Sequence, residues 1–364
     1  MKIKIMHIIP SLNQVGGAEK FVIDLVSHFD KEKTEVILVV QYNNPPSDAF
    51  VETIEKYNVN IVYLKKKKGF DISNIRQLRK VIRQFHPDVI NTHISSFLYA
   101  VYATRFLKEK PILFHTVHNI AEKEAGKIKR ILYRKFYKCY KCYPIAISDE
   151  IKKSVESFYG LMNVDCVFNG IVYEDFYCQK RNETTNNSFV HIGRFGYQKN
   201  HDLLVDAFKL LIQKIPDLKL SLIGTGENFD GIASKIKEYG LSDNMLLLGI
   251  LDRKSISRIL AESKYFILTS RYEGNPISLL EAMAAGCIPF VTRVGGIPDI
   301  IQENYNGYFI GNTPEEISSK ILSIISDETN QMLPETIQQS IVQYDMINVC
   351  SNYYDIYCKY LERK

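Results

Sequence analysis

The sequence lacks any apolar run that could cross a membrane. Of its 364 residues, 46% are hydrophobic and 24% are charged, yet no stretch approaches the ~20 apolar residues of a membrane-spanning helix. The first six residues alternate lysine with apolar residues. This segment is too short, and too charged between its apolar residues, to be a secretory signal peptide. We therefore expect a cytoplasmic protein whose N-terminus forms the first strand of the fold.

Cysteine is scarce and odd in number, with seven residues scattered at positions 139, 142, 166, 178, 287, 350 and 358. Disulfide frameworks belong to small secreted chains, so these cysteines do not change the expected compartment. Cys139 and Cys142 have the C-x-x-C spacing, but no second pair or histidine pair follows at the spacing of a zinc site. The pair also lies in a basic helical stretch, which argues against a zinc or redox role.

The charge is unevenly distributed around a net value of +5. Residues 1–183 carry 29 Lys and Arg against 20 Asp and Glu, whereas residues 184–364 carry 17 against 21. A basic first half indicates a negatively charged partner such as anionic lipid, a phosphate-bearing acceptor or nucleic acid. Nucleic acid is the weakest of these, because no recognised nucleic-acid-binding motif accompanies the charge.

Short β-branched runs alternate with helical patterns along the chain, which predicts parallel sheets with helices on both faces. The expected strands are residues 3–9, 35–40, 61–64, 88–91, 112–117, 144–147 and 165–168, then 189–192, 219–223, 245–248, 265–268 and 288–291. The polar stretch 179–188 between these sets is expected to be a linker. The expected fold class is α/β: two doubly wound, Rossmann-like domains facing a cleft, with ligands beyond the carboxyl ends of the strands. The expected boundaries are 1–180, 181–344 and a C-terminal helical segment, 345–364.

Residues 273–286 carry the most specific pattern. Asn275 and Pro276 suit the N-cap and the first position of a helix, and Gly286 can end that helix in the left-handed conformation. Free amides at this helix N-terminus favour an anionic or hydroxyl-rich ligand, which Glu273 and Glu281 would bracket. Acidic residues are also common near helix starts, but a carboxylate at 281 in so apolar a helix is costly without a partner.

Two cations project from a single loop after the strand at 189–192. The guanidinium of Arg194 and the ammonium of Lys199 together suit a diphosphate. The sequence contains no Asp-x-Asp metal motif, so these cations would replace a metal ion in stabilising a leaving diphosphate. The alternative is a solvated basic loop. Glycine turns at 224–226 and 295–296, and Gly16-Gly17 before the first helix, allow close approach of a ligand but are weak signals alone.

Together these segments resemble the retaining glycosyltransferases of family 4, which have the GT-B fold, and the resemblance covers almost the whole chain. It implies an acceptor-binding first domain, a nucleotide-sugar-binding second domain and a C-terminal helix that packs back on the first. It also implies a metal-independent hexosyltransferase without a cofactor, whose donor is a nucleotide-diphosphate sugar carrying UDP. The implied catalytic residues are Glu273, His118, Arg194 and Lys199.

The resemblance also implies a set of donor-binding positions. The glycines at the strand ends approach the donor, Glu281 binds the ribose and the backbone of Ile250 reads the base. The full set is Gly16, Gly17, Gly193, Gly224, Ile250, Gly274, Asn275, Pro276, Ile277 and Glu281. His118 would lie near the donor sugar, where it binds a hydroxyl or influences proton transfer without being the base. His93 is a weaker candidate.

Basic residues on two segments of the first half indicate a surface for an anionic membrane or an acceptor. Lysines end the third strand, and the helix at 127–141 mixes cations with aromatic residues. A solvated helix face is the alternative. The candidate residues are Lys65, Lys66, Lys67, Lys68, Lys129, Arg130 and Arg134. We expect a cytoplasmic protein, peripheral on the inner face of the plasma membrane.

The predicted function is transfer of a sugar to a saccharide or lipid-linked acceptor in surface polysaccharide assembly. Two alternatives are a nucleotide-sugar epimerase of the same fold and a non-catalytic module that binds polysaccharide or membrane.

Overall fold

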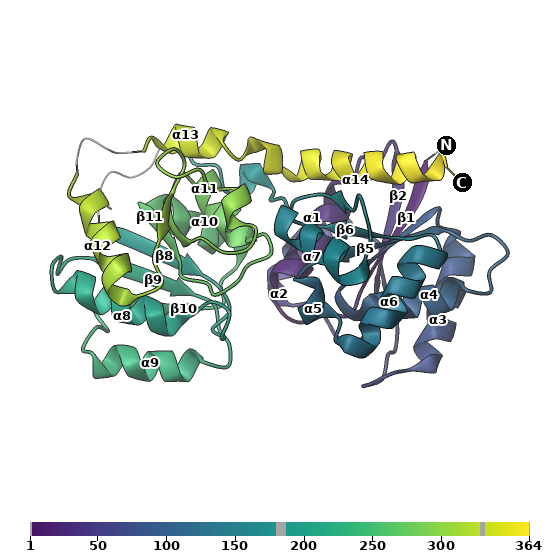
Figure 1. Cartoon of the computed structure of the whole chain (residues 1–364), viewed down its shortest axis with the longest axis horizontal. Helices are drawn as coiled ribbons and strands as arrows, with labels where there is room; N and C mark the ends of the chain where they lie inside the picture. The colour runs from purple at the N-terminus through teal and green to yellow at the C-terminus, as the bar shows by residue number, and fades with distance from the viewer. Residues whose placement is uncertain (1, 180–186, 328–331, 364) are drawn as a thin grey trace. The chain divides into compact units, whose positions relative to one another are not determined.

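The computed structural model describes residues 2–179, 187–327 and 332–363 (Figure 1). The chain divides into two compact units, one formed by Met1–Gly170 with Met346–Lys364 and the other by Ile171–Asp345. The predicted linker at 179–188 lies mostly outside the described residues.

The division at Gly170 comes ten residues before the predicted boundary at 180. The reason is that the intervening segment packs on the second unit. The backbone N–H of Ile171 donates to the carbonyl of Tyr344 at 3.0 Å, and Asp175 forms an ion pair with Arg253 at 2.7 Å.

The first unit contains a seven-stranded parallel sheet in the order β3-β2-β1-β4-β5-β6-β7. Its strands are β1 (Ile3–Ile9), β2 (Thr34–Val40), β3 (Ile61–Tyr63), β4 (Val89–His93), β5 (Ile112–Val117), β6 (Cys142–Ala146) and β7 (Asp165–Cys166). Its helices are α1 (Gly17–His28), α2 (Asp48–Lys56), α3 (Ile72–Phe85), the single turn η1 (Ile94–Ser96), α4 (Phe97–Thr104), α5 (Ala121–Glu124), α6 (Lys127–Cys139), α7 (Asp149–Tyr159) and α14 (Met346–Leu361). This is the predicted doubly wound architecture.

Alternation along the strands places two different layers on the two faces of this sheet. On one face, Ile90 and Leu113 belong to a buried apolar cluster with residues of α3, α4, α6 and α7. On the other face, α14 covers the sheet through hydroxyl contacts. Asn91 Nδ2 donates to the hydroxyl of Tyr357 at 2.8 Å, and the hydroxyls of Thr116 and Tyr353 lie 3.3 Å apart. The C-terminal helix is thereby bound to the first sheet.

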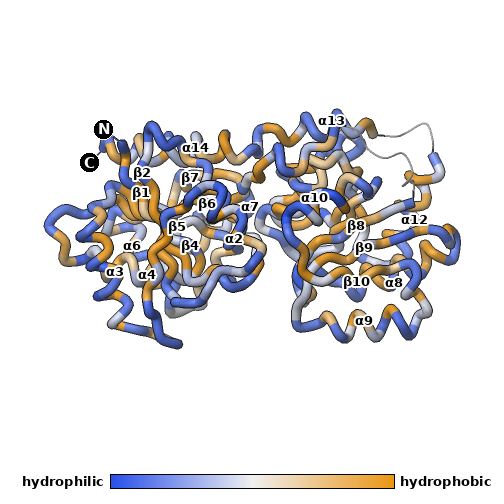
Figure 2. Tube along the Cα trace, turned by 180° about the vertical axis from the view of Figure 1, so that it is seen from behind, coloured by the Kyte–Doolittle hydropathy of each residue, from blue (hydrophilic) through white to orange (hydrophobic). Residues whose placement is uncertain are grey.

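The second unit repeats the design with six parallel strands in the order β10-β9-β8-β11-β12-β13. Its strands are β8 (Ser188–Ile192), β9 (Lys219–Ile223), β10 (Met245–Gly249), β11 (Tyr265–Leu268), β12 (Ile288–Thr292) and β13 (Tyr308–Ile310). Its helices are α8 (His201–Ile212), α9 (Phe229–Glu238), α10 (Arg253–Glu262), α11 (Ile277–Ala284), α12 (Pro314–Ile325), α13 (Pro334–Gln339) and the single turns η2 (Tyr173–Asp175), η3 (Ile297–Asp299) and η4 (Val342–Tyr344). β13 was not predicted, because a strand of three residues is too short to show a clear hydrophobic pattern in the sequence. Figure 2 shows the hydrophobic residues of each unit concentrated on its strands.

Candidate functional site

The strand order of the second unit creates a switch point between β8 and β11. From β8 the chain moves outward to β10 and then crosses back to β11, so the loops after β8 and β11 diverge at a switch point. In open α/β sheets, ligands bind at such a point, beyond the carboxyl ends of the strands. The loop after β8 carries Arg194 and Lys199, and the loop after β11 carries Glu273.

The structure brings Lys199 and Glu273 together at this point. Lys199 Nζ lies 2.6 Å from Glu273 Oε1, and the two side chains are only 14% and 5% exposed. The same carboxylate oxygen accepts from the hydroxyl of Ser270 at 2.5 Å, while Oε2 accepts from Gln198 Nε2 at 3.3 Å. Three donors on two loops therefore hold Glu273 in one orientation.

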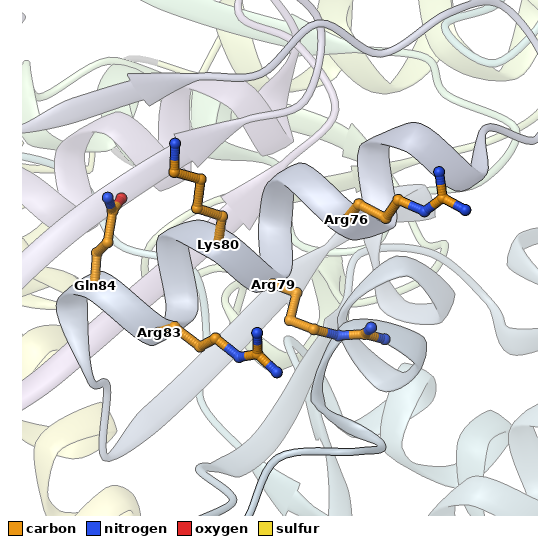
Figure 3. Close-up of a pocket in the computed structure, with 5 residues that line it drawn as sticks. All are labelled: Arg76, Arg79, Lys80, Arg83 and Gln84. Carbon is orange, nitrogen blue, oxygen red and sulfur yellow. The ribbon is translucent and has the colours of Figure 1, made fainter.

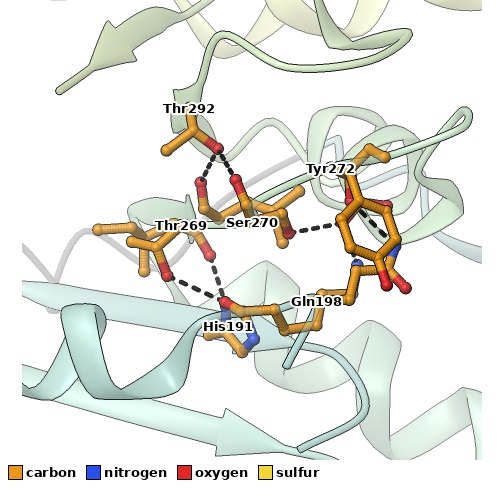
Figure 4. Close-up of polar contacts among 10 residues, drawn as sticks. His191, Gln198, Thr269, Ser270, Tyr272 and Thr292 are labelled. Atoms are coloured by element: carbon orange, nitrogen blue, oxygen red, sulfur yellow. Dashed lines mark hydrogen bonds and ion pairs between the residues drawn. The ribbon is translucent and has the colours of Figure 1, made fainter. Parts of the chain in front are cut away.

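Further hydrogen bonds join the two loops (Figure 4). Gln198 Nε2 also donates to the carbonyl of Tyr272 at 3.0 Å, and the Thr269 hydroxyl donates to the carbonyl of Lys199 at 3.2 Å. The Thr292 hydroxyl donates to the carbonyl of Ser270 at 2.8 Å, which ties in the end of β12. A ligand would meet a rigid polar surface.

A glycine turn after β12 lies directly against the backbone of Glu273. Gly295 has a φ of +60°, and a Cβ at this position would overlap the carbonyl oxygen of Glu273. The adjacent Gly296 N–H donates to the Gly274 carbonyl at 3.1 Å. The turn at 294–298, a weak signal in the sequence, thus supports the loop that carries Glu273.

Helix α11 begins one residue later than predicted. Pro276 is its N-cap, with extended backbone (φ −75°, ψ 110°), and Asn275 precedes the helix. Our placement of Asn275 as the N-cap and Pro276 as the first helical residue is therefore wrong, because Pro276 already has non-helical ψ. The prediction for Gly286 is confirmed: its φ is +76° and its N–H donates to Met283. Glu281 is only 2% exposed.

Arg194 lies in the same loop as Lys199 but takes another partner. Its Nη2 lies 3.1 Å from Glu227 Oε2, and its side chain is 70% exposed. A hydrogen bond from the backbone N–H of Glu227, and secondarily the charge of Arg194, lower the pKa of the Glu227 carboxyl. Glu227, Gln198, Ser270 and Thr292 were not among the predicted site residues, and only their positions at strand ends signal a role.

The remaining predicted donor-binding positions of the second unit lie at strand ends along the same edge of the sheet. Gly224, with a φ of +130°, packs so closely that a Cβ would overlap the Gly193 carbonyl. The N–H of Gly224 donates to the Gly249 carbonyl at 2.8 Å, next to Ile250, which is 59% exposed. The turns after β8, β9 and β10 are therefore in direct backbone contact. Gly274 and Ile277 flank the start of α11.

In the first unit, His118 lies just after β5 and is joined to His93. The distance from His93 Nδ1 to His118 Nε2 is 3.0 Å. Burial lowers the pKa of His118 to about 3. His115 is a separate case, because its Nε2 lies 2.7 Å from Glu124 Oε1.

Gly16 and Gly17 form the start of α1, with Gly16 as its N-cap. The carboxylate of Glu19 folds back over Gly16, where an added Cβ would meet it. Acidic side chains are stabilised at this end of a helix, so the position of Glu19 in the first turn of α1 has a structural explanation.

The basic residues of the first unit are mostly exposed, but the aromatic residues of α6 are not. Tyr133, Phe136 and Tyr137 are at most 7% exposed and pack in the core. The expectation that the aromatic residues of α6 contribute to a membrane surface is therefore wrong for these three rings. Ile131, 75% exposed, is a large apolar residue that α6 presents to solvent.

The predicted basic residues differ in how firmly they are held. The Lys66 ammonium is engaged, donating to Tyr42 Oη at 2.8 Å and to the Gly69 carbonyl at 2.7 Å. Arg130 Nε donates to the Phe158 carbonyl at 2.8 Å. The others are exposed: Lys65, Lys67, Lys68, Lys129 and Arg134.

Helix α3 carries a second basic cluster that the sequence analysis did not single out. A pocket is lined by Arg76, Arg79, Lys80, Arg83 and Gln84, all from this helix (Figure 3). Arg79 is held in place, because its Nε and Nη2 donate to the carbonyls of Ala103 and Tyr102 at 2.9 Å each. The cluster adds to the basic surface of the first unit.

Within the described ranges, no helix is long and apolar enough to cross a membrane. The same ranges contain no group of three or more His, Cys, Asp or Glu side chains arranged to hold a metal ion.

Comparisons with known proteins follow the division of the chain. Residues 174–340 match the family model described as "Glycosyl transferases group 1", and residues 15–175 match the one described as "Glycosyltransferase Family 4". The UDP-Gal:alpha-D-GlcNAc-diphosphoundecaprenol alpha-1,3-galactosyltransferase of Escherichia coli is 24% identical over 98% of this chain and 97% of its own length.

Solved structures show the same fold. Anabaena HepE in complex with UDP-glucose superposes with a TM-score of 0.82 at 16% identity, covering 98% of this chain and all of that one. The lipopolysaccharide outer core galactosyltransferase WaaB superposes with a TM-score of 0.74 at 19% identity, again covering 98% and 100%.

Proposed function

The chain belongs to the glycosyltransferases of family 4 with the GT-B fold, and from this premise we propose that it is a retaining, metal-independent hexosyltransferase that uses a UDP-linked sugar. The acceptor is a saccharide or lipid-linked saccharide in surface polysaccharide assembly. This part of the proposal is supported by the E. coli relative, whose name specifies a UDP-galactose donor and a diphosphoundecaprenol-linked acceptor. Family membership as an enzyme argues against the alternative of a non-catalytic binding module.

The pairing of Lys199 with Glu273 at the switch point carries the proposal. The buried Lys199 ammonium supplies positive charge to the β-phosphate as the sugar–phosphate bond breaks. Glu273 accepts hydrogen bonds from hydroxyls of the sugar, and its orientation is already set by Ser270 and Gln198. Charge and orientation are thus in place before the donor arrives, which lowers the cost of reaching the transition state.

The other predicted residues have supporting roles in this proposal. Arg194 is exposed and leaves Glu227 for the diphosphate, a low-cost exchange because exposed ion pairs contribute about 0–1 kcal/mol. Glu281 binds the ribose, and the backbone at Ile250 contacts the base. The amides at Gly16 and Gly17 bind a phosphate oxygen. The Glu19 carboxylate, which lies over Gly16, moves away from the helix N-terminus when the phosphate binds.

The test is incubation of the whole protein with UDP-glucose, UDP-galactose, UDP-N-acetylglucosamine and GDP-mannose, followed by detection of slow donor hydrolysis. We expect release of UDP from one UDP-sugar, abolished in Glu273→Ala and Lys199→Ala, and a rise in melting temperature with UDP but not GDP. An initial product with the anomeric configuration of the donor supports retention. Conversion of a donor into its epimer, or hydrolysis of GDP-mannose alone, would overturn the proposal.

We also propose that the protein is cytoplasmic and binds the inner face of the plasma membrane through the basic surface of the first unit. The exposed cations of α6 and of residues 65–68 support this proposal, since each near-surface cation contributes about 1 kcal/mol to binding an anionic leaflet. Nucleic acid is not the proposed partner of this surface.

A further inference from the structure

Three histidines form a continuous line through the first unit. The Nδ1 atom of His7 lies 3.0 Å from Nε2 of His93, and Nδ1 of His93 lies 3.0 Å from Nε2 of His118. The strand register explains the line. His7 is level with Asn91, and His93 is level with Thr116, so each step to the next strand also moves two residues towards the carboxyl edge. A shift of two residues keeps all three side chains on one face of the sheet.

The line runs from the interior of the sheet to its edge. His7 and His93 are completely buried, whereas His118 is only partly buried. The ring of Phe29 packs near His7 and that of Phe21 meets His118 edge-on, so aromatic residues enclose the line from the side. Its accessible end, His118, is at the carboxyl edge where doubly wound sheets bind ligands.

All three rings are neutral at pH 7. Burial lowers the pKa of His7 to about 3 and that of His93 well below its usual value, as it does for His118. A neutral imidazole has one N–H and one acceptor nitrogen, so the two hydrogen bonds along the line can run in either of two directions. Either each Nδ1–H donates towards His118, or each Nε2–H donates towards His7.

The interior end of the line distinguishes the two directions. If protons pointed towards His7, its Nε2 would have to carry the proton, yet this buried atom has no hydrogen-bond partner among the described residues. A buried N–H without an acceptor is rarer and more costly than a buried lone pair without a donor. The favoured arrangement therefore has protons on Nδ1 of His7 and on Nδ1 of His93, and His118 accepts a hydrogen bond at Nε2.

Building on the proposed function, we propose that His93 is a positioning residue which, with His7, fixes His118 as the tautomer that carries its proton on Nδ1. His118 then offers an N–H to a ligand oxygen at the carboxyl edge of the first sheet. It does not act as a base through Nε2, since that lone pair is occupied by His93. For Nδ1 of His118, the described part of the chain supplies no hydrogen-bond partner, so this N–H is available to a ligand.

Kinetics of three variants test the role of His93, using the UDP-sugar that the donor panel identifies. His93→Phe removes the hydrogen bond and lowers kcat about 10- to 100-fold, the size of effect that misplacing a contacting group produces. His93→Asn puts an amide N–H where Nδ1 was and restores most of the rate. His115→Gln is the control, because His115 is equally buried but bonds to Glu124 outside the line. Wild-type kcat in His93→Phe, or no difference between Asn and Phe, would overturn the proposal.

A measurement without substrate separates this inference from the proposed function. In protein labelled with ¹⁵N-histidine, the signals of His118 are assigned by their loss in His118→Gln. We expect an unprotonated Nε2 and a protonated Nδ1 in the wild type, and loss of this single tautomer in His93→Phe. A proton on Nε2 of His118 would refute the inference, whatever the donor panel shows. Failure of every UDP-sugar with the expected tautomer present would instead count against the proposed function.

Discussion

Lys199 and Glu273 are 74 positions apart in sequence, yet their charged atoms lie 2.6 Å apart with both side chains almost completely buried. The pair joins the ends of β8 and β11, the two strands between which the second sheet reverses its order. It therefore contributes to both the stability of the unit and the proposed chemistry.

Removing both members of this pair destabilises the protein less than the sum of the two single changes. Lys199→Met leaves a buried carboxylate without its cation, which costs about 3 kcal/mol, the low end for breaking a buried pair. The double variant Lys199→Met/Glu273→Gln loses less than the sum of the single changes, because no isolated charge remains. Urea unfolding of the four proteins measures the coupling. Additive losses would show that the two groups do not stabilise one another.

Gly295→Ala distorts the loop that carries Glu273. Its φ of +60° is unfavourable for alanine, and the new Cβ overlaps the Glu273 carbonyl. We expect a loss of stability of more than 1 kcal/mol together with loss of donor turnover. Gly231→Ala in α9 is the matched control: its Cβ meets nothing within 4 Å, so stability rises by about 0.5–1 kcal/mol and turnover is unchanged. A tolerated Gly295→Ala would mean that the loop adapts freely.

Arg194 and Glu227 are expected to affect binding rather than folding. Arg194→Ala leaves the melting temperature nearly unchanged, because the pair is exposed. It weakens UDP binding at least about tenfold, since a charge-assisted contact to the diphosphate is lost. Glu227→Gln removes the competing carboxylate and strengthens UDP binding about two- to fivefold, the equivalent of one exposed ion pair. Calorimetric titration with UDP measures both. Weaker binding in Glu227→Gln would show that the carboxylate assists the ligand.

Acid destabilises the second unit through His201, which stacks on Phe195 with 3.9 Å between ring centroids. Burial lowers the pKa of His201 to about 4, below its unfolded value of 6.5. Above pH 6.5 neither state binds the proton. Between pH 6.5 and 4 only the unfolded state binds it, so stability falls as pH falls, by about 2 kcal/mol between 6.5 and 5. In His201→Leu, urea midpoints should fall less steeply over this range. An unchanged slope would assign the acid sensitivity to other groups.

Neutralising α6 reduces binding to anionic membranes. Replacing Lys129, Arg130 and Arg134 by glutamine removes three cations, worth about 1 kcal/mol each near such a surface, so affinity for phosphatidylglycerol vesicles falls about 100-fold. The charge-matched control replaces the exposed Lys214, Lys219 and Lys237 of the second unit and leaves binding unchanged. Equal losses in both variants would indicate attraction by overall charge alone.

Sequence patterns were sufficient for the architecture. Alternating β-branched runs and helical periods predicted two doubly wound sheets, because strand and helix periodicities depend on neighbouring residues. Gly286 marked a helix end for a similarly local reason, since few other residues adopt a positive φ. Local patterns also singled out Glu273 and Lys199 as ligand-binding candidates, and the family resemblance added His118.

Tertiary structure decided which candidates meet. Local pattern could not show that Lys199 pairs with Glu273 while Arg194, five residues earlier, turns to Glu227, because these partners come from different loops. It could not align His7, His93 and His118 either, since their line depends on the register of three strands. The aromatic residues among the cations of 127–141 indicated a membrane surface, and only packing against the rest of the first unit buried those of α6. Chain-local preferences thus determined the elements, and long-range packing determined the contacts between their side chains.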